Sequence, residues 1–184
     1  MENLFKQLSD AQASLFILFH KTWIYHWNVT GPDFHQLHTM FGEQYETMFE
    51  ELDRLTENMR FLNMKPVSTL SRAIEVSQVA QAVTSVEGIN AKGMVKDLLV
   101  SNQTLISYLT DVHNTADRLE SLGTTNILED ILETHGKFVW MLRSIAESAR
   151  GAAAVEDVQP EVPEVAESVV TEVTEEVSTE EVSE

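Results

Sequence analysis

Apolar side chains recur along most of the chain at the spacing of an α-helix. Over residues 3–28 they form a stripe at every third or fourth position, and over residues 34–63 they alternate steps of four and three in a long heptad-like seam. The same periodicity returns over residues 91–122 and 126–149. No alternating strand pattern competes within residues 1–150, so we expect an all-α domain of four long helices.

Breaks in this pattern set the expected connections. Gly31-Pro32 should separate the first two helices, because proline removes a backbone donor and glycine readily adopts turn conformations. Residues 67–90 form a long link with a short helix around Leu70–Ile74, and such a crossover is typical of the ferritin-like four-helix bundle. Gly123 is expected to close the third long helix as a C-cap. Capping boxes are expected at two helix starts, Asp33 with Gln36 and Asn126 with Glu129.

Charge divides the chain into two parts. The net charge is −18, and residues 151–184 carry eleven acidic and no basic residues. This segment consists of few residue types without an aromatic side chain, so we interpret residues 1–150 as the folded domain and residues 151–184 as a disordered acidic tail. Both parts are acidic, which argues against direct DNA binding, because that requires a basic patch or arm.

The remaining composition narrows the class of protein. The chain has no cysteine, which excludes disulfides and thiolate metal sites. We find neither a secretory signal at the start nor an apolar run long enough to cross a membrane. These features together predict a cytoplasmic protein with no membrane association.

Two histidines and two carboxylates are the candidate metal ligands of this chain. His26 and His38 lie six residues either side of Gly31-Pro32, so they should face each other across a helical hairpin. Asp53 and Glu57 lie one turn apart on one face of the second helix. Imidazole and carboxylate ligands together suit iron, with zinc or manganese as competitors.

These two pairs cannot meet within one straight helix. His38 and Asp53 are separated by fifteen residues, or roughly 22 Å at 1.5 Å per residue, against a metal bond of about 2 Å. Either the pairs are unrelated, or a second, antiparallel copy of the chain brings its carboxylates to these histidines, twice per two-fold interface. In the unrelated case, the histidines are hydrogen-bonded core residues, and the carboxylates form a solvated face paired with Arg54 and Arg60.

The stretch HWNVTGPDFHQLH, continued by Phe41, Tyr45, Asp53 and Glu57, resembles the signature of the Dps family of mini-ferritins. The segment HGKFVWMLRS at 135–144 is similar to the family's last helix, so the resemblance covers most of residues 3–149. It implies a hollow homo-dodecamer built from two-fold dimers that oxidises Fe²⁺, usually with hydrogen peroxide, and stores ferric mineral. It also implies that His26 and His38 of one subunit and Asp53 and Glu57 of another form the ferroxidase site.

One position departs from the family pattern. Many members carry an acidic residue four positions after the second histidine, where it helps to hold a second iron, and here that position is Gly42. Glu43 is adjacent, but a shift of one residue turns a side chain by about 100° around a helix, which makes it a poor substitute. Gly42 supports one alternative to a ferroxidase, a shell that has lost the chemistry. The resemblance leaves a second alternative open, a nucleoid-compacting DNA binder, as some family members are.

Overall fold

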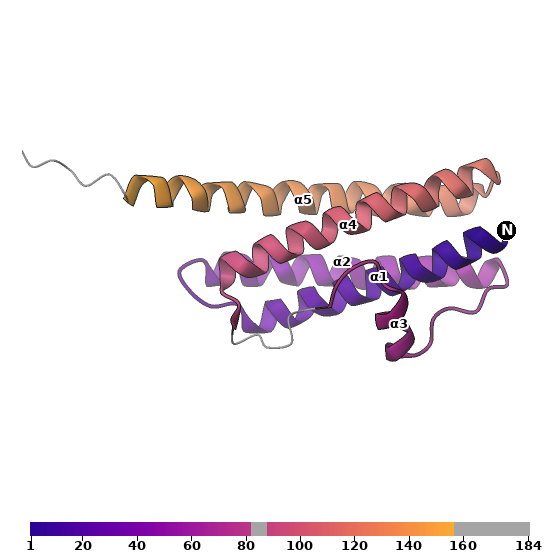
Figure 1. Cartoon of the computed structure of the whole chain (residues 1–184), viewed down its shortest axis with the longest axis horizontal. Helices are drawn as coiled ribbons and strands as arrows, with labels where there is room; N and C mark the ends of the chain where they lie inside the picture. Colours follow the sequence, from indigo (N-terminus) through magenta and orange to yellow (C-terminus); the bar gives the residue numbers. More distant parts are fainter. Residues whose placement is uncertain (82–87, 157–184) are drawn as a thin grey trace, which may run out of the picture.

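In the part of the chain that the structure describes, four long helices lie along a common direction, and one short helix packs on their outside (Figure 1). The structure is a computed structural model that describes residues 1–81 and 88–156, the side chains of 148–156 excepted. The helices are α1 (Glu2–Asn28), α2 (Phe34–Phe61), α3 (Leu70–Val76), α4 (Ala91–Arg118) and α5 (Leu122–Glu156). The predicted all-α bundle with a short helix in its long connection is confirmed.

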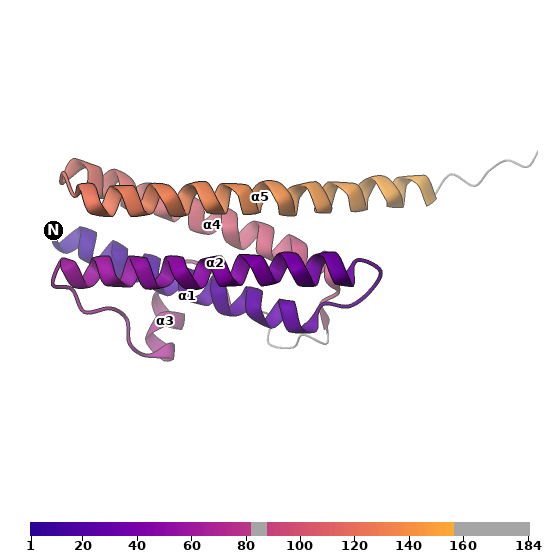
Figure 2. The same ribbon diagram turned by 180° about the vertical axis from the view of Figure 1, so that it is seen from behind.

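The long helices close into a ring around one core. α1 packs against α2 and α4, and α5 packs against α4 and α2, while α3 packs against α1 (Figure 2). The apolar stripes expected from the sequence point into this core. Its fully buried members include Leu8, Leu18, Phe41, Leu55, Leu98, Leu105, Leu109 and Leu128.

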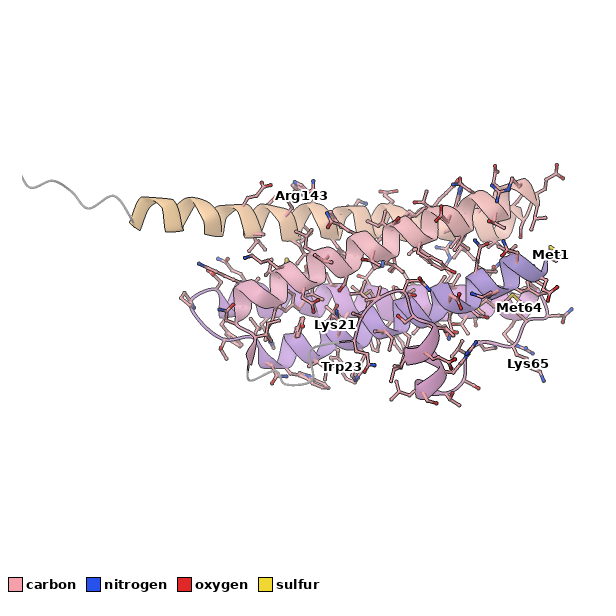
Figure 3. The ribbon with its side chains drawn as sticks, viewed as in Figure 1. Met1, Lys21, Trp23, Met64, Lys65 and Arg143 are labelled. Carbon is pink, nitrogen blue, oxygen red and sulfur yellow. The ribbon has the colours of Figure 1, made fainter. Side chains whose placement is uncertain are left out.

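Buried polar contacts tie the ring together across its interior. Lys21 of α1, labelled in Figure 3, is fully buried. Its Nζ donates to Asp97 Oδ1 at 3.1 Å and to Ser101 Oγ at 2.9 Å, both on α4. His135 of α5 is also fully buried, between Asn102 Oδ1 at 2.6 Å and Glu51 Oε2 at 3.2 Å. Burying these groups would be costly without such partners. His135 is thus a hydrogen-bonded core residue.

The helix ends differ from the expectations at two places. α4 ends at Arg118 and α5 begins at Leu122, so neither Gly123 nor Asn126 marks a helix end. Glu120 instead takes the left-handed conformation (φ 54°), which ends α4 early. Asp33 does cap α2, but without a side-chain hydrogen bond, so the first capping box is absent as well.

The last helix is longer than predicted. α5 continues through Glu156, past the expected end near residue 149, and projects beyond the other helices (Figure 1). Residues 151–156, which we had assigned to the tail, therefore belong to this helix. The rest of the predicted tail, residues 157–184, lies outside the described residues, as do 82–87 of the long connection. No helix in the described ranges is long and apolar enough to cross a membrane.

Candidate metal centre

The α1–α2 hairpin brings the two candidate histidines into direct contact. Gly31 adopts a positive φ of 109° in the turn, a conformation that glycine takes without steric cost. The chain then reverses, and the imidazole rings of His26 and His38 stack with their centroids 3.8 Å apart and their planes 21° from parallel. The prediction that these residues face each other across a hairpin is confirmed.

Each histidine is held by the backbone of the other. His26 Nδ1 lies 2.7 Å from the carbonyl oxygen of His38, and His38 Nδ1 lies 2.8 Å from the carbonyl oxygen of His26. A carbonyl oxygen can only accept, so each Nδ1 carries the proton. In the neutral ring Nε2 then keeps its lone pair, which is the tautomer that a metal-binding histidine needs.

The stacking also limits how the rings can share an ion. A ring nitrogen binds a metal about 2 Å away along its in-plane lone pair. Stacked planes only 21° from parallel do not meet at that distance. In this arrangement the two Nε2 atoms could not both bind the same ion.

Aromatic side chains surround the histidine pair. Tyr45 lies edge-on to His26 with ring centroids 5.2 Å apart, and Phe34 stacks on His38 at 5.1 Å. Trp27, the immediate neighbour of His26, is 55% exposed and contacts Trp23. These contacts were not predicted from the sequence, because apolar periodicity does not separate a ring that lines a site from one that packs the core.

Asp53 and Glu57 lie further along α2, and both side chains are exposed. Arg54 instead pairs with Asp130 at 2.6 Å, and Arg60 donates to the carbonyl oxygen of Met64 at 2.7 Å. Over residues 1–81 and 88–147 we find no ion pair to either carboxylate, so they are available as ligands. Within the same residues of one chain, no three His, Asp or Glu side chains are grouped so that they could hold a metal ion.

Gly42 and its neighbour Glu43 lie on different sides of α2. Gly42 is buried directly beside the His26 ring, whereas Glu43 is exposed. This is the consequence expected from the rotation of about 100° per residue. Glu43 makes no hydrogen bond or ion pair to the histidines in the described part of the chain.

Sequence comparison with known proteins identifies the class of protein. Residues 5–152 match the family model of the ferritin-like domain. The DNA protection during starvation protein of Helicobacter pylori is 31% identical over 140 residues, which cover 76% of this chain and 96% of that protein. A low temperature-induced protein of Nostoc is 33% identical over 141 residues, covering 76% of this chain and 78% of its own.

Solved structures narrow the class further. The crystal structure of a Dps protein from Bacillus brevis has a TM-score of 0.74 and 28% sequence identity, covering 78% of this chain and 95% of its own. The Dps structure from Staphylococcus aureus has a TM-score of 0.75 and 25% identity, with 79% and 96% coverage. The chain belongs to the Dps family of ferritin-like proteins.

Proposed function

We propose that this protein is a ferroxidase and iron-storage protein that oxidises Fe²⁺ at sites shared by two subunits. The observation that carries the proposal is the reciprocal hydrogen bonding of His26 and His38, which leaves an Nε2 lone pair on each ring. A related solved structure, from Vibrio cholerae, is described as a member of the ferritin-like diiron-carboxylate proteins. Two nitrogen ligands of one subunit and two carboxylates of another are a donor set that suits iron, and one that zinc or manganese could also occupy.

The separation along α2 supports a second copy as the source of the carboxylates. His38 and Asp53 lie roughly 22 Å apart at the rise of an α-helix, too far to share an ion. An antiparallel copy related by a two-fold axis near the middle of this stretch would set Asp53 and Glu57 of each chain beside the histidines of the other.

The middle of this stretch has the surface that such an interface needs. Phe19 of α1 lies 6.3 Å from Tyr45 and 6.0 Å from Phe49 of α2, measured between ring centroids, and Phe49 is 61% exposed. Trp23 extends the group, 6.1 Å from Tyr45. Phe49 is exposed and the other three rings are half-buried, and aromatic side chains gathered in this way on one face are typical of an interaction surface. We infer that two copies pair over this aromatic face and that such dimers build a dodecamer.

The proposed reaction balances with peroxide as the oxidant. Each of two Fe²⁺ ions gives up one electron, the O–O bond of hydrogen peroxide breaks, and two protons complete two molecules of water. The Fe³⁺ product then moves to the interior of the oligomer and forms the mineral. Consuming Fe²⁺ and peroxide together removes the reagents of oxidative damage, so DNA would be protected without being bound by this acidic chain.

The test is anaerobic loading of the purified oligomer with Fe²⁺, followed by a pulse of hydrogen peroxide and measurement of ferric absorbance. We expect rapid oxidation of Fe²⁺ by the parent protein and loss of this rapid oxidation in the His26→Ala/Asp53→Ala variant. His35→Ala is the matched control, because His35 is exposed one turn from His38 and its imidazole contacts neither candidate histidine. An assembled parent that oxidises no iron above the buffer blank would refute the proposal and leave a shell without chemistry.

A further inference from the structure

Gly42 of α2 lies against the His26 ring of α1. A Cβ atom built on Gly42 would sit 3.2 Å from Cε1 and 3.3 Å from Nδ1 of that imidazole. These separations are shorter than the usual carbon contact of about 3.5–4.0 Å. Any other residue at position 42 would therefore require the ring to move away by a few tenths of an ångström.

The His26 ring has little freedom to give way. His38 stacks on one face of it, Tyr45 lies edge-on at 5.2 Å, and Nδ1 is fixed by its 2.7 Å hydrogen bond to the carbonyl oxygen of His38. Nδ1 is also one of the two atoms closest to the missing Cβ. A side chain at position 42 would thus press on the atom whose hydrogen bond sets the tautomer and the direction of Nε2.

We propose that Gly42 is a positioning residue of the metal centre. Because Gly42 has no side chain, the His26 imidazole can pack directly against the backbone of α2. This inference rests on the proposed function, and it reverses the interpretation of Gly42 as a lost ligand. In this chain a side chain at position 42, acidic or not, would press on the His26 ring and disturb the hydrogen bond that orients it.

Gly136 offers a matched comparison. It also lies within a long helix, but a Cβ atom built there meets nothing within 4 Å. Alanine is the better helix former, so Gly136→Ala should raise the melting temperature of the oligomer. If Gly42 had no role beyond its helix, Gly42→Ala would do the same.

The first test is a double-mutant cycle on the metal-free protein, followed by thermal unfolding. Gly42→Ala should lower the melting temperature when His26 is present. In the His26→Ala background, where the ring is gone, the same substitution should raise it as Gly136→Ala does. An equal rise in both backgrounds would overturn the proposal. This outcome does not depend on whether the protein oxidises iron.

The second test is anaerobic titration with Fe²⁺ followed by calorimetry. Gly42→Ala and Gly42→Asp should each weaken binding about tenfold or more, the range found when a group that orients a metal-binding histidine is removed. Gly136→Ala should leave the affinity unchanged. Tighter binding or an additional ion in Gly42→Asp, or unchanged affinity in Gly42→Ala, would contradict the positioning role of Gly42 but not the proposed function. A parent that binds no Fe²⁺ would instead refute the proposed function.

Discussion

The hydrogen bonds that orient His26 and His38 are made to backbone carbonyl groups of the hairpin rather than to side chains. His26 belongs to the last turn of α1, where carbonyl groups lack a partner within the helix, and His38 Nδ1 donates to its carbonyl oxygen. Because the hairpin is short, the facing of the two histidines could be predicted from their spacing around Gly31-Pro32. The tautomer could not, since it depends on which carbonyl oxygen each ring reaches.

Gly42 shows a second limit of sequence reasoning. The resemblance to the Dps family predicts the loss of a ligand at this position, whereas the structure places the His26 ring against the backbone of Gly42. The difference arises because the neighbour that matters comes from α1, and spacing along α2 alone cannot reveal it.

Tyr108 leads to a prediction at high pH. Burial first, and then the negative charge and hydrogen bond of Asp10 Oδ2 at 3.3 Å, raise the pKa of Tyr108 above its ordinary value. The neutral phenol is therefore favoured in the folded chain, so its stabilising effect is complete below about pH 10, the ordinary tyrosine value, and is lost as the pH rises further. Tyr108→Phe should flatten this alkaline loss of stability, measured by urea unfolding from pH 8 to 11. An unchanged slope would contradict this assignment.

At the scale of helices, the existence and order of the elements follow from periodicity, but their ends do not. The α4–α5 turn shows why. Ser121 N donates to Ala116 O at 3.0 Å and Glu120 N donates to Asp117 O at 2.8 Å, the pair of bonds of a Schellman motif. Glycine usually takes the left-handed position of this motif, and here Glu120 takes it. A prediction that expects glycine in the left-handed position chooses Gly123, which lies three residues after Glu120.

Glu120→Gly should therefore stabilise the protein. A left-handed conformation costs a residue with a Cβ atom about 1 kcal/mol, which glycine avoids, although its more flexible unfolded chain offsets part of the gain. Asn63 is the matched control, because it ends α2 in the same conformation (φ 60°) and asparagine tolerates that conformation better than glutamate. Chemical denaturation should show a larger gain for Glu120→Gly than for Asn63→Gly, and the reverse order would refute the explanation.

At the scale of the whole molecule, the fold class and the four candidate ligands could be predicted from the sequence, but the aromatic face could not. Phe19 and Phe49 come from different helices. Phe19 fits the apolar stripe of its helix, whereas Phe49 lies beside the seam of the other, and neither pattern says that the two rings meet. Only the packing of α1 against α2 shows that Phe49 remains exposed.

Phe49→Glu should break the proposed two-fold pairing. A carboxylate in the centre of an apolar interface would lose its hydration without gaining a partner. We expect smaller particles by size-exclusion chromatography with light scattering, an unchanged helical circular dichroism spectrum, and loss of iron oxidation. Val100→Glu is the control, because Val100 is a similarly exposed apolar residue on α4, at 60%. Normal assembly of the Phe49→Glu variant would exclude this face as the dimer interface.

Because the histidines and the carboxylates lie far apart along α2, the proposed site would take each pair from a different chain, and each pair could be altered on its own chain. A chain with His26→Ala keeps Asp53 and Glu57, and a chain with Asp53→Ala keeps both histidines. Each variant alone forms only defective sites, but a mixed dimer holds one intact site and one that lacks both residues. Co-expression of the two variants should therefore restore oxidation at about a quarter of the sites under random pairing by two-fold symmetry. Two inactive alleles would together produce an active protein.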